Sequence, residues 1–276
     1  MPDADAVSRS RLAVWGDPIA HSKSPALHAA AYAVLGRDWT YERRRVAESE
    51  FSAALGSLGD DWRGLSLTMP LKEQAFRAAM TRDRHAELTG AVNTLLLGPV
   101  IAGFNTDVGG IVDALGEAGI STAPSVRILG AGATAASSLV AAAEMGASHV
   151  EVRARRPERA AGLADLGPRL GVTVTTAPLD APTEAVDLTI ATLPSGTALD
   201  PDVADHLAAA GGALFDAAYA PWPSALATAW GAGPVISGLG MLLHQAVRQI
   251  RIFHQGDPDA ALPDEAGVLA AMRAAL

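Results

Sequence analysis

Lysine is rare in this chain, and one of its two lysines stands where a proton-transfer group could act. Of 21 basic residues, 19 are arginine, and only Lys23 and Lys72 are lysine. An arginine keeps its charge at neutral pH, whereas a suitably desolvated lysine can release a proton. Lys72 lies in the stretch SLTMPLKEQAF, at a predicted strand-to-helix boundary. This placement favours proton transfer, with chance retention of a lysine as the alternative.

Two further polar residues end or follow predicted strands: Asn93 in GAVNT and Asp107 in GFNTDVGG. The strand ends of an open α/β sheet gather at the edge where ligands bind. We therefore expect Lys72, Asn93 and Asp107 to lie together, where an ammonium–carboxylate pair would hold the lysine for proton transfer. The structural alternatives are that Asn93 fixes a turn and that Asp107 caps a helix beginning at Val108.

A pair of serines precedes the first predicted helix, in GDPIAHSKSPALH. Ser24 suits the N-cap position and Pro25 the first helical position, which would explain both residues without a ligand. The functional interpretation is that Ser22 and Ser24 turn their hydroxyls toward one anion at the helix start. The sequence leaves these two interpretations open.

A glycine-rich loop follows a later strand, in SVRILGAGATAAS. Gly130 permits a tight turn, and Gly132 lets the backbone approach a pyrophosphate. The pyrophosphate would lie at the N-terminus of the helix that starts near Ala133 and Thr134. Glycine also serves any sharp strand-to-helix turn, so the motif depends on its strand–turn–helix context. In that context it predicts dinucleotide binding.

The next strand end indicates which dinucleotide binds. An NAD site usually has an acid there, and Glu151 stands at about the right spacing but lies inside the predicted strand. The turn itself offers Arg155, Arg156 and Arg159. A guanidinium matches a 2′-phosphate and stacks on adenine, so the turn favours NADP. A solvated basic turn that caps a helix is the alternative.

Short apolar runs alternate with helical patterns, which predicts an α/β fold with parallel sheets in two domains. Predicted helices include 24–36, 48–59, 70–80 and 108–119. Residues 91–97 and 100–106 resemble a hairpin around Gly98-Pro99. We expect a substrate domain over residues 1–118, a Rossmann-type cofactor domain over 119–238, and helices over 239–276 that return to the first domain.

The composition excludes several classes of function. The formal net charge of −9 argues against general nucleic-acid binding. The 276 residues contain no cysteine, hence no disulfide or thiolate metal site, which suits the cytoplasm. The N-terminus has no apolar signal-peptide core, and no apolar run is long enough to span a membrane. The seven histidines show no metal-binding spacing.

Taken together, the motifs resemble the shikimate dehydrogenase family. PIAHSKSP, LTMPLK, GAVNT, GFNTD, GAGATA, DAAYAPWPSAL and SGLGMLLHQA occur in the family's order, between about Val14 and Phe253. The resemblance implies reversible reduction of 3-dehydroshikimate to shikimate with NADP, in aromatic amino-acid biosynthesis, and Lys72 and Asp107 as the catalytic pair. It implies substrate binding by Ser22, Ser24, Thr68, Asn93, Tyr219 and Gln245, and cofactor contacts at Thr192 and Gly238.

Some positions depart from the family pattern. Ser66 replaces an asparagine, Ala29 follows His28 where asparagine is frequent, and Ala133 replaces a glycine. The first two changes reduce the expected support around the substrate. The family's N-R-T turn here reads Ala154-Arg155-Arg156, which changes the residues expected beside the adenine ribose.

Three rival functions stay open at this point. One is an NAD-dependent quinate/shikimate dehydrogenase, and another is a paralogue acting on an amino-substituted analogue of shikimate. The third is a non-catalytic sensor of cofactor or shikimate, against which the presence of Lys72 and Asp107 argues. The sequence is compatible with a monomer or a homodimer.

Overall fold

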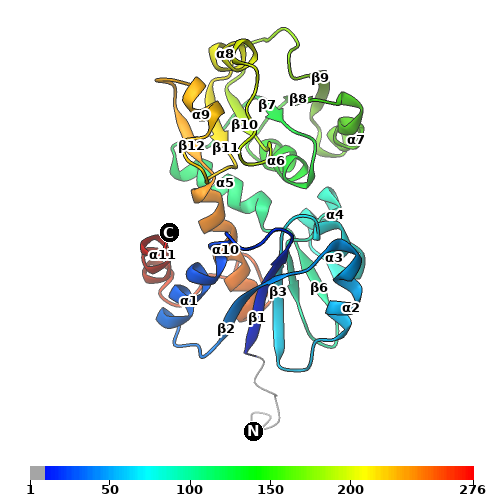
Figure 1. The fold of residues 1–276 in the computed structure, drawn as a ribbon, viewed down its shortest axis with the longest axis vertical. Helices are drawn as coiled ribbons and strands as arrows, with labels where there is room; N and C mark the ends of the chain where they lie inside the picture. The colour runs from blue at the N-terminus through cyan, green and yellow to red at the C-terminus, as the bar shows by residue number, and fades with distance from the viewer. Residues whose placement is uncertain (1–9) are drawn as a thin grey trace. The chain divides into compact units, whose positions relative to one another are not determined.

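The computed structural model describes residues 10–276, which form two compact units. The first contains residues 10–106 and 245–276, and the second contains residues 107–244. Each unit is built around its own six-stranded sheet (Figure 1). The α/β fold in two domains that the sequence predicts is confirmed.

The first unit has a mixed sheet in the order β2-β1-β3-β5-β6-β4. Strands β1, β2 and β3 are parallel, whereas β5 is antiparallel to both β3 and β6. The β5–β6 pair is the hairpin expected around Gly98-Pro99. The strands are β1 (Arg11–Gly16), β2 (Thr40–Arg45), β3 (Trp62–Leu67), β4 (Thr81–Arg82), β5 (Thr94–Leu96) and β6 (Ala102–Phe104).

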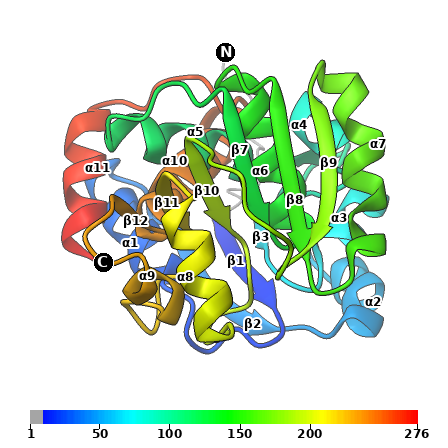
Figure 2. The same ribbon diagram turned by 90° about the horizontal axis from the view of Figure 1, so that it is seen from above.

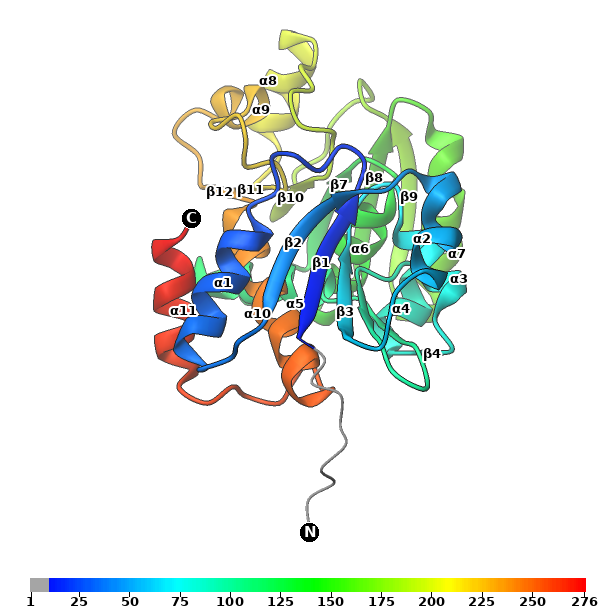
Figure 3. The ribbon, with the colours of Figure 1, turned by 60° about the horizontal axis from the view of Figure 1, so that its bottom comes forward.

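Helices from both ends of the chain complete the first unit. Helix α1 and helix α11 lie side by side (Figure 3), although more than 200 residues separate them. The helices are α1 (Ser24–Val34), α2 (Phe51–Gly56), α3 (Lys72–Ala78), α4 (Arg84–Thr89), α11 (Glu265–Ala274) and the later part of α10 (Leu239–Gln255), with a 3-10 turn at Glu48–Glu50.

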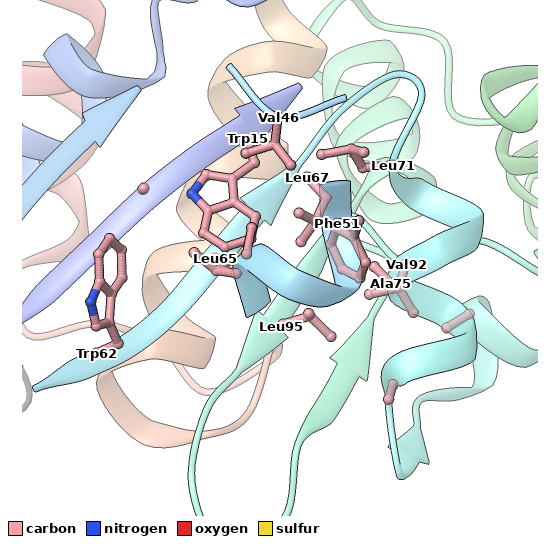
Figure 4. Close-up of a cluster of buried hydrophobic side chains, with 14 residues drawn as sticks. Trp15, Val46, Phe51, Trp62, Leu65, Leu67, Leu71, Ala75, Val92 and Leu95 are labelled. Carbon is pink, nitrogen blue, oxygen red and sulfur yellow. The ribbon is translucent and has the colours of Figure 1, made fainter. Parts of the chain in front are cut away.

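A buried apolar cluster lies on one face of this sheet (Figure 4). Trp15 of β1 meets Phe51 of α2 edge to face, with ring centroids 6.2 Å apart. Leu65 of β3 and Leu71, just before α3, are both fully buried within it. Burial of such side chains contributes about 1.5–3 kcal/mol each, and it holds the strand ends and α3 in place.

Helix α3 begins later than the sequence predicts. We expected a helix from Pro70 to Met80, but the helical residues are Lys72–Ala78. The Leu71 amide donates a hydrogen bond to the Thr68 carbonyl at 2.8 Å, which closes a turn over residues 68–71 before the helix starts. Lys72 is therefore the first residue of α3.

The second unit has a fully parallel sheet in the order β12-β11-β10-β7-β8-β9. In chain order this is the 3-2-1-4-5-6 arrangement of a Rossmann fold; Figure 2 shows β7, β8 and β9 side by side. The strands are β7 (Ser125–Leu129), β8 (His149–Ala154), β9 (Thr173–Pro178), β10 (Leu188–Ala191), β11 (Ala213–Asp216) and β12 (Val235–Ser237).

The second unit begins at Asp107, earlier than the residue 119 that the sequence predicts for the cofactor domain. Helix α5 packs on α6, so it belongs to the second unit rather than to the substrate domain. The second division falls within α10, after His244. The helices are α5 (Asp107–Glu117), α6 (Ala133–Glu144), α7 (Ala161–Leu170), α8 (Pro201–Ala209) and α9 (Ala225–Ala229), with a 3-10 turn at Pro157–Ala160.

Candidate active site

Three of the predicted site residues meet at one edge of the first sheet. The Thr68 amide donates to the carbonyl of Trp15 in β1 at 2.9 Å. The Asn93 carbonyl accepts a 2.7 Å hydrogen bond from the Leu67 amide, and the Lys72 carbonyl accepts a 3.0 Å hydrogen bond from the Val92 amide. The backbone therefore brings Thr68, Lys72 and Asn93 together where β3 ends and β5 begins.

Asn93 fixes the chain just before Asp107. Its side-chain oxygen accepts hydrogen bonds from the Thr106 amide at 3.0 Å and from the Thr94 hydroxyl at 2.9 Å. Its amide nitrogen lies 2.9 Å from the Thr106 hydroxyl oxygen. Asn93 therefore does fix a turn of the backbone, as the structural alternative in the sequence analysis predicts. Asp107 is buried at the first position of α5, and its pairing with Lys72 stays a prediction.

The two serines at the start of α1 have different surroundings. The N-cap residue is Lys23, with no side-chain cap, so of the two interpretations left open the one in which Ser24 caps this helix does not hold. The Ser22 hydroxyl accepts a hydrogen bond from the Ser24 amide at 3.3 Å. Ser24 already lies inside the helix and is buried.

Sequence reasoning missed a second set of polar residues beneath this edge. Tyr41 of β2 donates a hydrogen bond to Ser66 of β3 at 2.7 Å, and Ser66 donates one to Gln249 of α10 at 2.8 Å. Gln245 and Gln249 are one helical turn apart, and both are buried. That i, i+4 spacing of two amides is a signal that could have identified Gln249.

The glycine loop of the second unit has the backbone that a dinucleotide turn requires. Gly130 has φ = +118°, and a β-carbon there would collide with the hydroxyl of Thr192. The Thr192 amide and hydroxyl both donate to the Leu129 carbonyl, at 2.8 and 2.9 Å. Gly130 and Thr192 therefore lie together where β7 and β10 end, at the switch point of the strand order.

Helix α6 starts directly after this turn and leaves its first amides available for a ligand. Gly132 is the N-cap residue, with no side-chain cap, and Ala133 is the first helical residue. The space next to Gly132 is open, because a β-carbon there would meet nothing within 4 Å. The free amides and dipole of a helix N-terminus suit a pyrophosphate, and Thr134 in the first turn is half-buried.

The basic turn after β8 lies in the same unit. The Gly130 amide donates to the Arg153 carbonyl at 2.8 Å, so the ends of β7 and β8 are tied together. Arg155, Arg156 and Arg159 follow this point, and all three are exposed. The Arg159 amide closes the turn by donating to the Arg156 carbonyl at 3.0 Å.

Glu151 is already engaged inside the sheet. One carboxylate oxygen lies 2.7 Å from Arg127 Nε, and the other lies 2.8 Å from an Arg153 terminal nitrogen. Burial opposes ionisation of Glu151, but the hydrogen bonds and charges of the two arginines lower its pKa overall. Glu151 therefore does not serve as the ribose-binding acid of an NAD site.

The two arginines also explain how one face of this sheet is covered. Residues 179–187, between β9 and β10, form neither helix nor strand. Arg153 donates to the carbonyls of Ala181 and Pro182, and Arg127 donates to that of Glu184. Both guanidinium groups are completely buried, so they satisfy the carbonyls of a loop that stands where a helix usually packs.

Two further predicted residues lie at the ends of β11 and β12. Gly238 is buried, and a β-carbon there would collide with the Ala217 carbonyl, so this position requires glycine. Its amide lies 3.3 Å from the Ala218 carbonyl, next to Tyr219. Tyr219 is half-buried, and this burial raises the pKa of its hydroxyl.

Residues 10–276 contain neither a metal-binding cluster nor a helix able to span a membrane. No group of three or more histidine or acidic side chains there could hold a metal ion. None of the helices in that range is both long and apolar enough to cross a bilayer.

The fold and the glycine turn define a Rossmann-type dinucleotide-binding unit, joined in one chain to an α/β unit with a polar sheet edge. Residues 14–95 match the family model described as the shikimate dehydrogenase substrate binding domain. A shikimate dehydrogenase (NADP(+)) of Methylobacterium radiotolerans is 39% identical over 253 residues, 87% of this chain and 90% of the relative. The chain belongs to the shikimate dehydrogenase family.

Solved structures agree with this assignment. The shikimate dehydrogenase of Mycobacterium tuberculosis is 40% identical and matches with a TM-score of 0.81, over 96% of this chain and 99% of that one. A shikimate 5-dehydrogenase of Thermus thermophilus, solved in complex with NADP(H) and shikimate, is 33% identical and matches with a TM-score of 0.79, over 97% of this chain and all of that one.

Proposed function

We propose that this chain catalyses the reversible, NADP-dependent reduction of 3-dehydroshikimate to shikimate in aromatic amino-acid biosynthesis. The observation that carries the proposal is the meeting of Thr68, Lys72 and Asn93 at one sheet edge, in a chain similar over most of its length to NADP-dependent shikimate dehydrogenases.

Lys72 and Asp107 form the proposed catalytic pair. When bound, NADPH supplies a hydride to the ring ketone. Lys72 gives a proton to the ketone oxygen as negative charge develops there, and it takes that proton back in the reverse direction. Asp107, which directly follows the residue held by Asn93, orients the ammonium group. Lysine suits this role because arginine can supply charge but not readily a proton.

The remaining residues of the first unit bind the substrate in this proposal. Ser22 and Ser24 hold its carboxylate at the start of α1. Thr68, Asn93 and Gln245 bind its ring hydroxyls, and Tyr219 of the second unit also approaches it. The burial of Ser24, Asn93 and Gln245 supports this proposal, because buried polar groups give orientation and specificity at a small-molecule site.

The second unit holds NADP through its backbone and its basic turn. The amides after Gly130 and Gly132 bind the pyrophosphate at the start of α6, and Gly238 lets the chain approach the nicotinamide. Arg155, Arg156 and Arg159 bind the 2′-phosphate. Because Glu151 is held by Arg127 and Arg153, the turn offers positive charge rather than an acid, which favours NADP over NAD.

A spectrophotometric assay tests this function. The full chain is mixed with shikimate and either NADP or NAD, and absorbance of the reduced cofactor is followed. We expect turnover with shikimate and NADP, and a much higher KM for NAD. The same assay with quinate and with an amino-substituted analogue of shikimate separates the two enzymatic rivals. Tight binding of shikimate without turnover would instead indicate a sensor.

We place the enzyme in the cytoplasm, as a monomer or a homodimer. The absence of cysteine is compatible with a reducing compartment. Cell fractionation tests the location, and light scattering on the purified chain tests the oligomeric state.

A further inference from the structure

A line of hydrogen bonds runs through the first unit beneath the proposed substrate residues. It begins at Tyr41 of β2. Tyr41 donates to Ser66 of β3 at 2.7 Å, Ser66 donates to Gln249 of α10 at 2.8 Å, and the Gln249 amide donates to the Asn93 carbonyl at 3.3 Å. Side chains thereby link β2, β3 and α10 to the residue that precedes β5.

The line ends at Asn93, a proposed ligand for a ring hydroxyl of the substrate. Each hydroxyl has one proton to donate. Tyr41 donates its proton to Ser66 and Ser66 donates its own to Gln249, so the three bonds point the same way. Burial raises the pKa of Tyr41 more than its polar neighbours lower it, so the hydroxyl stays protonated.

The ring of Tyr41 is also fixed by its neighbours. The imidazole of His28 stacks on it, with centroids 3.8 Å apart and planes inclined by 15°. His28 is itself fixed, since its Nδ1 lies 2.9 Å from the hydroxyl of Tyr32. Both His28 and Tyr32 are buried. Stacking sets the direction in which the Tyr41 oxygen points.

Ser66 stands where the family commonly has asparagine, which led us to expect weaker support around the substrate. The amide that an asparagine would supply comes here from Gln249, which is 2% exposed and reaches Ser66 from the opposite end of the chain. A short residue on β3 and a long one on α10 together complete the polar line in this chain.

We propose that Tyr41 and Gln249 are positioning residues, which hold the hydroxyl-binding Asn93 in place beside the end of β3. This inference rests on the proposed function, because it takes Asn93 as a substrate ligand. Neither residue takes part in proton transfer, so the line acts on substrate affinity rather than on the rate of the chemical step.

Tyr41→Phe removes one oxygen and keeps the stacked ring. We expect the KM for shikimate to rise roughly three- to thirtyfold, as for loss of one buried hydrogen bond, with kcat and the KM for NADP nearly unchanged. Thr189→Val is the control, since it removes a buried hydroxyl that donates to the Gly211 carbonyl in the second unit, outside this line. It should lower the melting temperature without changing the KM for shikimate.

A second variant tests the continuity of the line. Gln249→Met keeps the length of the side chain and removes its amide, so it should also raise the KM for shikimate. In the double variant with Tyr41→Phe the two effects should be less than additive, because both break the same line. Full additivity, or an equal KM rise in Thr189→Val, would overturn the inference.

The proposed function and this inference fail differently. If the unaltered chain does not oxidise shikimate, the proposed function falls and the inference falls with it. If the unaltered chain turns over shikimate and Tyr41→Phe has the same KM, only the inference falls. Melting temperatures of all variants separate loss of positioning from loss of folded protein.

Discussion

The side-chain oxygen of Asn93 accepts a hydrogen bond from the backbone amide of Thr106 at 3.0 Å, so a residue at the start of β5 fixes the chain that enters α5. Thr106 is buried, and the next residue is Asp107. The Asn93 side chain therefore fixes the position of the backbone directly before Asp107, the proposed partner of Lys72. This role is separate from its proposed contact with the substrate.

Replacing Asn93 should affect both stability and substrate binding. Asn93→Ala leaves the buried Thr106 amide without this acceptor, which costs about 1–3 kcal/mol in the free energy of unfolding. It also removes a substrate ligand, so the KM for shikimate should rise. Urea denaturation and steady-state kinetics measure the two effects. A loss of stability with an unchanged KM would leave Asn93 with only its turn-fixing role.

Replacing Lys72 should slow the chemical step. Loss of a general acid–base group typically lowers the rate by about 10²–10⁴, so Lys72→Ala should lose that much kcat with little change in KM. Lys72→Arg is the control for charge, and it should also be slow because a guanidinium does not readily give up a proton. Recovery of kcat in the arginine variant would show that charge alone suffices.

Replacing the basic turn should change cofactor preference. Arg155→Ala combined with Arg159→Ala removes two charged donors, and a charge-assisted hydrogen bond contributes about 1.5–3 kcal/mol. We expect the KM for NADP to rise at least tenfold and the KM for NAD to stay the same. Arg169→Ala, an exposed arginine of the same unit, should change neither value. Equal loss for both cofactors would contradict a 2′-phosphate site.

Replacing Glu151 should destabilise the second unit. Glu151→Gln leaves the buried guanidinium groups of Arg127 and Arg153 without their counter-charge, which costs about 3 kcal/mol. Glu42→Gln is the control, because Glu42 pairs with Arg11 on the surface at 3.7 Å and such pairs contribute at most about 1 kcal/mol. Similar melting temperatures for the two variants would show that the buried charges need no acid.

Acid should destabilise the first unit through His28. Burial lowers the pKa of His28 from 6.5 to about 3. Between these values the unfolded chain binds a proton that the folded chain does not, so this contribution to stability is complete above pH 6.5 and falls as the pH decreases toward 3. The slope for one proton is about 1.4 kcal/mol for each pH unit.

A His28→Gln variant checks that pH dependence. Its free energy of unfolding should be lower at neutral pH but should fall less steeply between pH 6.5 and 4 than that of the unaltered chain. His206→Gln, at the end of α8 and outside the buried core, should keep the original slope. If the free energy of unfolding fell with the same slope between pH 6.5 and 4 in all three proteins, His28 would not be the source of the pH dependence.

The local elements and motifs were readable from the sequence because they depend on near neighbours in the chain. Glycine at Gly130 is required by a positive φ, and the alternation of strands with helices predicts a parallel sheet. The start of α3 was wrong because the turn that precedes it depends on a hydrogen bond between Leu71 and Thr68 rather than on proline preference. Ser24 does not cap α1, because the helix already includes Ser24 and its N-cap residue is Lys23.

The sequence alone determined the family resemblance, the Rossmann-type unit and the candidate chemistry of Lys72, because each depends on residue types in a short stretch. Only the tertiary structure decided that Glu151 pairs with Arg127 and Arg153. It also decided that Gln249 bonds to Ser66, which lies 183 residues away in the chain. The physical reason is that a polar side chain bonds to whichever partner the packing of strands and helices brings near, and spacing along the chain does not encode that partner.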